Sequence, residues 1–381
     1  MRKTKLIALL LAVAAIASMV VPSVSAAGVT SATCPCATCN GSVPTWEAWD
    51  EVKVKAGGHY YLTGNIDLEA QVTIAESATT CVNLAGYTIT AKEDKRVFGN
   101  KGTLTIIDSV GGGTLKGNGV VKASNGGVIR NESTGTLYLY AGTLTGGETG
   151  INGSGGKKSG GNIHNDGTAY IYGGTITGGK SANIGGNVCN YGKMYIYGGT
   201  ISGGTAASNG NELAGTSETY IFGGTITGTD PIYHKGGILN VYGGTLGKIK
   251  LVESAALTMF GGSIAGIDNA DSTVKLFNGV MGEAPADGQL AACATVHNVD
   301  GSYLVVNSDE TCTDCEFEAA LASYSKYITV IDPANPSVPS TPSTPQTGDN
   351  FSLHLYMGLM AFCLAALSVL LLTKKRNADV V

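Results

Sequence analysis

The sequence predicts an all-β fold, a parallel β-helix solenoid closed by short terminal caps. Three observations predict it: a phrase of about ten residues recurs, apolar residues alternate with period two inside each copy, and glycine pairs separate the copies' strands. The chain of 381 residues holds 56 Gly without a strict Gly-X-Y period, which excludes collagen. A period of about 20 residues is typical of a solenoid, in which each repeat packs on its neighbours.

The repeated phrase predicts two strands and a corner in each coil. It reads YIYGGTITGG at 170–179 and YIYGGTISGG at 195–204, and seven copies lie between 137 and 284. The double glycine fits a sharp corner because it carries no Cβ, and the Thr-Ile-Thr segment after it predicts a second short strand. One apolar position recurs in the first strand and is expected to point inward: Leu139, Ile171, Ile196, Ile221, Val241, Met259 and Leu276.

A third strand precedes the phrase in several copies, in the segments GGVIRNESTG, GGNIHNDG and GGNVCNYG. Asn131, Asn165 and Asn190 share an inward face there with apolar residues. Inward asparagines are expected to hydrogen-bond from coil to coil, because in-register strands stack about 4.8 Å apart. Three strands per coil, glycine corners and an asparagine ladder therefore predict a parallel β-helix.

Over residues 60–285 this arrangement resembles the right-handed β-helix of the pectin-lyase-like superfamily, and in particular the surface β-helix proteins of Gram-positive bacteria. The resemblance implies a single right-handed coil. Residues 27–59 and 286–331 would form cysteine-containing N-terminal and C-terminal caps. A calcium β-roll is excluded, because its Gly-Gly-x-Gly-x-Asp repeat is absent.

The N-terminus has the pattern of a secretory signal peptide over residues 1–26. A basic head with Arg2, Lys3 and Lys5 precedes an apolar stretch at 6–17, and small residues before Ala27 fit a cleavage site. The alternative is a transmembrane anchor. We expect the mature protein to be secreted and to begin at Ala27.

The C-terminus combines a spacer, a short motif, an apolar span and a basic tail. Proline recurs every third residue from Pro333, in the spacer at 332–344, to Pro345 in the motif, which favours extended polyproline II. The span at 351–373 is long enough to cross a bilayer, and Lys374, Lys375 and Arg376 follow it.

Residues 345–381 resemble a sortase cell-wall sorting signal, in which Pro345, Gln346, Thr347 and Gly348 match the motif. The resemblance implies cleavage between Thr347 and Gly348 by sortase and attachment to peptidoglycan. The family's usual Leu is Thr344 here. The alternative is a plain membrane anchor.

Tyrosines are the first candidate binding residues on the outside of the coil. They occupy one outward position, two residues before the aromatic residue that directly precedes each corner: Tyr138, Tyr170, Tyr195 and Tyr220. A tyrosine ring offers a flat apolar face and a hydroxyl, which suits a saccharide. The alternative is that tyrosines favour strands and cover one another.

A second candidate site consists of charged residues beside the inward asparagines. Arg130, Glu132, His164 and Asp166 would point outward on adjacent rungs, together with Cys189 and Tyr191. A base with cation support, or two carboxyl groups, could act on an acidic polysaccharide. The alternative is a solvated polar face, and no catalytic residue is expected.

Cysteines cluster near the two ends: Cys34, Cys36 and Cys39, then Cys293, Cys312 and Cys315. Secretion favours disulfides, the spacing is also compatible with zinc, and free thiols are the third option. Either kind of cross-link would tie down an end cap, which a solenoid needs to cover its open edge. No cofactor is expected.

Net charge limits the partners. It is −5 at pH 7, and the two processed ends carry more basic than acidic residues, so the mature chain is more acidic still. This argues against binding nucleic acid. The sequence predicts a wall-anchored, adhesin-like module that binds extracellular polysaccharide or host glycoprotein. The alternatives are an anchored polysaccharide lyase or glycoside hydrolase, and a passive stalk.

Overall fold

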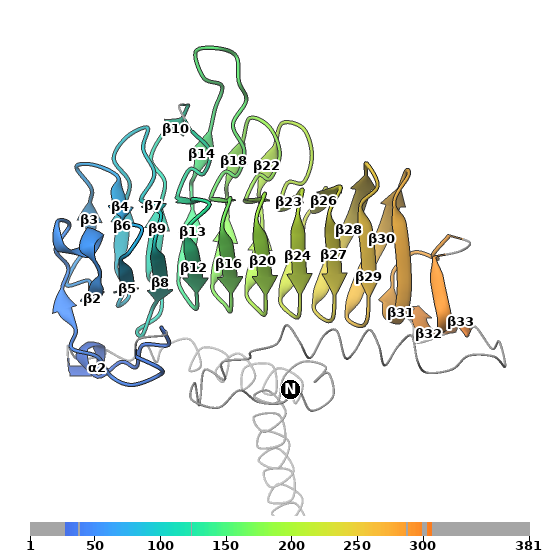
Figure 1. The fold of residues 1–381 in the computed structure, drawn as a ribbon, viewed down its shortest axis with the longest axis horizontal. Helices are drawn as coiled ribbons and strands as arrows, with labels where there is room; N and C mark the ends of the chain where they lie inside the picture. The colour runs from blue at the N-terminus through green and yellow to red at the C-terminus, as the bar shows by residue number, and fades with distance from the viewer. Residues whose placement is uncertain (1–26, 37–38, 123, 287–288, 299–302, 307–381) are drawn as a thin grey trace, which may run out of the picture.

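The computed structural model describes residues 27–36, 39–122, 124–286, 289–298 and 303–306. They form a right-handed parallel β-helix, as the sequence predicts, with successive coils side by side along one axis (Figure 1). Within these residues no helix is long and apolar enough to cross a membrane. The predicted signal peptide, spacer, sorting motif and span at 351–373 lie outside the described residues.

Each coil contributes one strand to each of three parallel ladders, here called faces A, B and C in chain order. Face A holds β4 (Val72–Ile74), β7 (Phe98–Asn100), β11 (Ile129–Asn131), β15 (Ile163–Asn165), β19 (Val188–Asn190), β23 (Leu213–Gly215) and β26 (Ile232–Lys235). Face B holds β2 (Gly58–Tyr61), β5 (Thr79–Asn83), β8 (Thr103–Ile107), β12 (Thr136–Leu139), β16 (Thr168–Ile171), β20 (Lys193–Ile196), β24 (Glu218–Ile221), β27 (Ile238–Val241) and β29 (Ala256–Met259). Face C holds β3 (Ile66–Asp67), β6 (Thr88–Thr90), β9 (Thr114–Lys116), β13 (Thr143–Thr145), β17 (Thr175–Thr177), β21 (Thr200–Ser202) and β25 (Thr225–Thr227).

The coils become shorter toward the C-terminal end, and strands then pass from one face to the next without a loop. β28 (Thr245–Val252) pairs with β25 on face C and with β26 on face A. β30 (Ser263–Asn269) pairs along β28, and β31 (Thr273–Met281) pairs with β29 and β30. The last described strands, β32 (Leu290–Asn298) and β33 (Tyr303–Val306), pair antiparallel and so end the parallel stacking.

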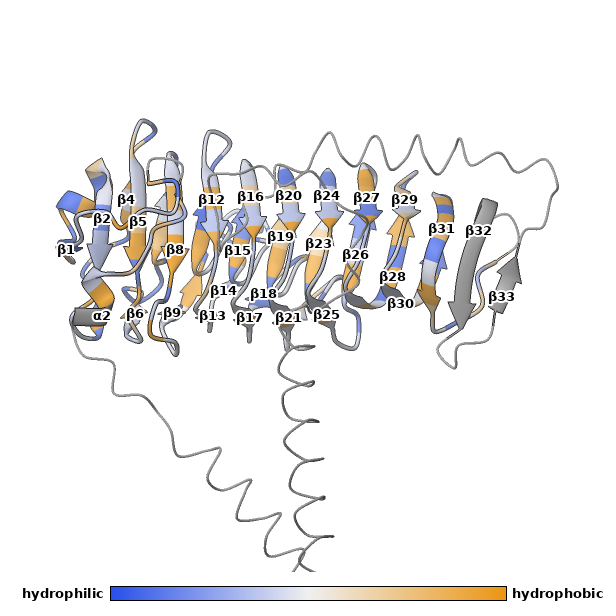
Figure 2. Cartoon of the chain, turned by 90° about the horizontal axis from the view of Figure 1, so that it is seen from below, coloured by the Kyte–Doolittle hydropathy of each residue, from blue (hydrophilic) through white to orange (hydrophobic). Residues whose placement is uncertain are grey.

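The inside of the coil is apolar, and every apolar residue that the sequence places inward on face B is buried there. These side chains belong to one continuous core that runs through the coils. Strands of successive coils line up along this core, and apolar residues recur within them (Figure 2). Period-two alternation and stacking in register thus account for the core directly.

The predicted asparagine ladder is present on face A. Asn100, Asn131 and Asn165 each donate from Nδ2 to Oδ1 of the next asparagine, at 2.7 Å in every case, and the row ends at Asn190. Each of the three also donates to a backbone carbonyl at 3.0 Å. These bonds satisfy polar groups that would otherwise be costly to bury.

A second polar row lies where the chain enters face A, and it was not predicted from the sequence. Asn162 donates to Asn187 at 2.8 Å, and Asn187 donates to the buried Glu212. The same side chains accept from backbone amides of Gly147, Gly179 and Gly204. These hydrogen bonds therefore connect the corner between faces C and A to the start of the following strand on face A.

Loops between faces C and A form a small parallel sheet of their own, and they rise above the rod (Figure 1). Its strands are β10 (Val120–Val121), β14 (Glu148–Thr149), β18 (Lys180–Ser181) and β22 (Thr205–Ala206). The insertions of different length at 146–161 and in the following copies therefore emerge at one corner and pair with one another there.

The N-terminal segment covers the start of the rod. It contains α2 (Ala27–Thr30), β1 (Glu47–Ala48), which pairs parallel with β2, and the 3-10 helix η1 (Lys53–Ala56). Val54 is fully buried, and Trp49 packs edge-on against Phe98 with ring centroids 6.3 Å apart. These apolar side chains close the end of the core.

Candidate functional site

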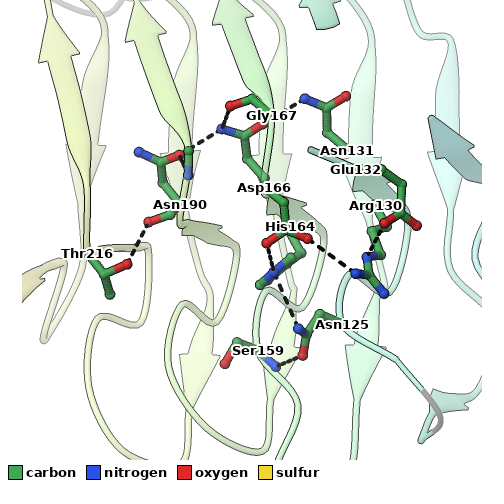
Figure 3. Close-up of polar contacts among 12 residues, drawn as sticks. Asn125, Arg130, Asn131, Glu132, Ser159, His164, Asp166, Gly167, Asn190 and Thr216 are labelled. Carbon is green, nitrogen blue, oxygen red and sulfur yellow. Dashed lines mark hydrogen bonds and ion pairs between the residues drawn. The ribbon is translucent and has the colours of Figure 1, made fainter. Parts of the chain in front are cut away.

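The four charged residues predicted from the sequence come together on the outer side of face A (Figure 3). Arg130 on β11 and His164 on β15 are register partners, and Glu132 and Asp166 follow the two inward asparagines of those strands. Alternation along each strand explains this placement, because residues on either side of an inward Asn point outward.

Arg130 is the centre of this cluster. Its Nε lies 3.1 Å from Glu132 Oε2, and its Nη2 lies 3.3 Å from Asp166 Oδ2. The other oxygen of Asp166 lies 3.0 Å from Nε2 of His164. One guanidinium thus pairs with both carboxylates, so neither is a free general base.

Loops cover much of the cluster, which the sequence did not predict. Arg130 Nη1 donates to Ser124 Oγ at 2.7 Å, and Asn125 Nδ2 lies 3.3 Å from His164 Nε2. Ser159 N donates to Asn125 Oδ1, which links two of the covering loops (Figure 3). His164 is 1% exposed in consequence.

Cys189 and Tyr191, which share this face, have different environments. Cys189 is fully buried with Ile184, Ala214 and Tyr233, whereas Tyr191 is 44% exposed. Cys189 and His164 thus point away from the core, as predicted, but lie beneath loops. Burial, together with the negative charge of Asp166, raises the pKa of the Cys189 thiol, so it is a protonated, inert side chain at neutral pH.

The electrostatics of the cluster favour a fixed ion network. Burial alone would raise the pKa of Asp166, but the hydrogen bond and charge of His164 and the charge of Arg130 hold it below its usual value. Nearby Arg96 is also buried, and burial together with the charge of Arg130 lowers its pKa to about 10. Nδ1 of His164 has no hydrogen-bond partner among the described residues. Arg96 and Arg130 together supply two positive charges against the two carboxylates of Glu132 and Asp166.

The four predicted tyrosines form a continuous stack on face B, here called the tyrosine row. Ring centroids are 4.9 Å apart from Tyr138 to Tyr170, 4.9 Å from Tyr170 to Tyr195, and 5.0 Å from Tyr195 to Tyr220. The rings are tilted by only 8° to 10° relative to one another. Strands in register place equivalent rings one coil apart, which explains the spacing.

A second stack, here called the corner row, lies two residues further along the chain in each coil, at the corner after face B. Its neighbouring centroids are 4.5 to 5.4 Å apart from Tyr140 to Phe277. Tyr170 and Tyr172 link the two rows, with centroids 6.4 Å apart. The members of the corner row are Tyr140, Tyr172, Tyr197, Phe222, Tyr242, Phe260 and Phe277.

Stacking changes what the tyrosines can offer a ligand. Because neighbouring rings cover each other's faces, flat sugar stacking on an inner ring is blocked, and ring edges remain. Tyr195 and Tyr220 are only 8% and 3% exposed, whereas Tyr138 and Tyr170 are half-buried. Tyr220 donates its hydroxyl to Glu218, which also pairs with Lys193. Mutual covering, the alternative considered from the sequence, describes these rings well.

Face C carries a feature that was not predicted from the sequence, two rows of hydroxyl side chains. They follow from the Thr-x-Thr or Thr-x-Ser segment that comes after the glycine corner in four copies of the repeated phrase. All of these residues except the exposed Thr245 are half-buried. One row contains Thr143, Thr175, Thr200, Thr225 and Thr245, and the other Thr145, Thr177, Ser202 and Thr227.

The N-terminal cysteines gather at one place beside face B. Cys34, Cys36 and Cys39 lie close to His59 on β2 and to Cys81 on β5. Cys34, Cys36, Cys39, Cys81 and Cys189 form no disulfide in the part of the chain that the structure describes. Cys293 belongs to β32, whose side chains are not described, and Cys312 and Cys315 lie outside the described residues.

Comparison with known proteins gave no relatives: no protein-family model, no curated protein and no solved structure matches this chain.

Proposed function

We propose that this protein is a Gram-positive cell-wall surface protein whose β-helix binds polysaccharide or the glycans of a glycoprotein. The observation that carries the proposal is the set of outward side-chain rows, which repeat in register from coil to coil on faces B and C. A surface with one repeated chemical unit per coil is complementary to a polymer with a repeated unit of similar length.

The chemistry of the rows suits a carbohydrate. Tyrosine hydroxyls on face B and threonine hydroxyls on face C can both donate and accept hydrogen bonds. Coils are about 4.8 Å apart, of the order of one sugar unit. The rod is held by its core and its asparagine ladder, so little side-chain or backbone freedom is lost on binding.

Attachment to the wall is the second part of the proposal. The signal peptide at 1–26, the proline-rich spacer and residues 345–381 support export followed by covalent linkage of Thr347 to peptidoglycan. The likeness of the coil to the pectin-lyase-like superfamily belongs to the same proposal. Sortase would then be the enzyme partner, and the spacer would hold the rod away from the wall.

We favour binding without catalysis. On this scaffold an enzyme would need a free carboxylate base or a reachable acid–base pair. Arg130 instead forms ion pairs with both Glu132 and Asp166, and His164 is covered by loops. The network is better suited to holding the covering loops on the rod.

The test measures retention of the full chain on immobilised plant, mucin and bacterial polysaccharides, with each supernatant assayed for new chain ends. We expect saturable binding without new ends. Replacing Tyr138 and Tyr170 together by Phe keeps the stack but removes two hydroxyls. It should weaken binding about thirtyfold, as expected for the loss of two hydrogen bonds worth about 1 kcal/mol each.

Tyr191→Phe is the matched control, because this exposed tyrosine lies on another face of the rod. It should bind like the unaltered protein. Equal affinity of all three proteins would refute the role of the tyrosine row. Release of new chain ends that is lost in Arg130→Ala would show instead that the protein is an enzyme.

A further inference from the structure

Three thiols and an imidazole meet at the N-terminal end of the rod. The Sγ atoms of Cys34, Cys36 and Cys39 and a ring nitrogen of His59 all lie within 4.8 Å of one another. Nε2 of His59 is 2.9 Å from Cys39 Sγ and 3.3 Å from Cys36 Sγ. Cys34, Cys36 and Cys39 are buried and His59 is half-buried, so the four groups face a common interior point.

Backbone hydrogen bonds shape the cysteine segment into a tight loop. Cys39 N and Asn40 N both donate to the carbonyl of Cys36, at 3.0 and 2.9 Å. Cys34 N donates to Ser42 O and Gly41 N donates back to Cys34 O, which closes the base of the loop. Asn40 and Gly41 both have positive φ, which this reversal requires. The loop therefore turns all three sulfurs to one side.

His59 reaches the same point from the rod itself. It occupies an outward position on β2 and is the register partner of Cys81 on β5. The ring of Trp46 packs edge-on against His59 with centroids 5.8 Å apart, and Trp46 Nε1 donates to Ala32 O. The imidazole is thus positioned by residues of both the rod and the cap.

We propose that Cys34, Cys36, Cys39 and His59 bind one Zn²⁺ ion. Three sulfurs and one imidazole nitrogen form a typical structural zinc set, with bonds of about 2.3 and 2.0 Å in a tetrahedron. Such a tetrahedron places the ligand atoms roughly 3.5 to 3.8 Å apart. Because the four ligand atoms all lie within 4.8 Å of one another, shifts of about 1 Å would bring them to this geometry. On binding, the three thiols would release three protons to solvent.

Cys81 supports the set from the next coil. Its side chain is fully buried, and its sulfur lies 2.7 Å from Cys34 Sγ as a hydrogen-bond partner. Outer groups of this kind orient metal ligands and stabilise their charge. The competing outcome is a Cys34–Cys81 disulfide, which would leave only three of the proposed ligands.

The ion would clamp the cap to the side of the rod. The cysteines pack with Trp46, Cys81 and Ile107 in a small cluster of their own, against Tyr61 and Tyr140. This cluster is separate from the core, and few apolar side chains contribute to it. A metal ion bound by both the cysteine loop and His59 on β2 would hold the loop against the rod, because little buried apolar area is available to hold it.

The test uses the full chain purified without added metal or oxidant. We expect one zinc per chain by atomic emission, and a visible absorption band of tetrahedral thiolate-bound Co²⁺ after exchange. Cys36→Ser and His59→Gln should each weaken zinc binding at least about tenfold in a chelator competition. Cys189→Ser, which removes a buried thiol elsewhere on the rod, should keep full stoichiometry.

A second measurement avoids variants that fail to fold. In the unaltered protein, removal of zinc by a chelator should increase the number of thiols that react rapidly with a thiol reagent, and zinc should reverse the increase. The proposal is overturned if the purified chain holds no zinc and its mass is two hydrogens below that of the fully reduced chain, which indicates a disulfide. It is also overturned if Cys36→Ser and His59→Gln both retain one zinc.

Discussion

His234 shows at the residue scale how a buried polar side chain couples the fold to pH. It is the register partner of Gly215 on face A and lies two coils beyond Asn190, the last asparagine of the ladder. The side chain is fully buried, Nδ1 donates to Gly236 O at 2.8 Å, and Nε2 has no partner among the described residues. Burial therefore lowers the pKa of His234 to about 4.

The folded protein should accordingly lose stability in mild acid. The ordinary pKa of 6.5 applies to the unfolded chain, so below it the unfolded state binds a proton that the folded state does not. The loss should begin near pH 6.5, continue until about pH 4, and amount to about 3 kcal/mol. Denaturant unfolding at pH 7 and pH 4.5 would measure it.

His234→Leu provides the comparison, because leucine occupies the equivalent position one coil later, at Leu251. This variant should have a smaller loss of stability between the two pH values. An identical loss in both proteins would show that other groups cause it.

At the scale of elements, glycines at the two ends of the face C strands are required for different reasons: Gly174 precedes β17, and Gly146 follows β13. Gly174 has φ +83°, and a Cβ there would lie 2.6 Å from the carbonyl oxygen of Gly142 in the preceding coil. Gly146 has φ +66°, but the nearest atom to its Cβ would be 3.5 Å away. Only at Gly174 does a positive φ coincide with close contact to the backbone of the adjacent coil.

Gly174→Ala should therefore destabilise the protein more than Gly146→Ala does. Both variants lose about 1 kcal/mol because alanine disfavours positive φ. Gly174→Ala should lose a further 1 to 3 kcal/mol or so, since the backbone of an adjacent coil must move. Chemical unfolding of the two variants at one pH gives the difference, and equal losses would contradict the packing argument.

At the scale of the whole molecule, the proposed display on the wall depends on residues outside the described structure. In a Gram-positive host that has sortase, we expect the chain to appear in the fraction released by digestion of peptidoglycan. Thr347→Ala removes the residue that would be joined to the wall, and should shift most of the protein to the membrane fraction. Immunoblots of the two fractions would measure the shift.

Thr341→Ala is the control for this experiment, because it changes the same residue type in the spacer, outside the motif. It should leave wall attachment intact. Thr347→Ala protein that remains covalently bound to peptidoglycan would refute sorting through this motif.

The sequence by itself determined the coil. Period-two alternation placed Ile171 and Ile196 inside, the double glycines marked the corners, and the repeat aligned Asn131, Asn165 and Asn190 into a ladder. These features are local or repeat at a fixed offset. Equivalent positions in stacked coils must then meet, so the pattern is sufficient to predict them.

Only the tertiary structure decided what the outward residues contact. Loops of unequal length pair with one another and cover His164 and Cys189, and adjacent tyrosines turn their faces toward each other. His59 joins cysteines at least 20 residues away in the chain because a loop folds back onto β2. Such contacts depend on loop closure and on side-chain packing between coils, neither of which leaves a periodic signal in the sequence.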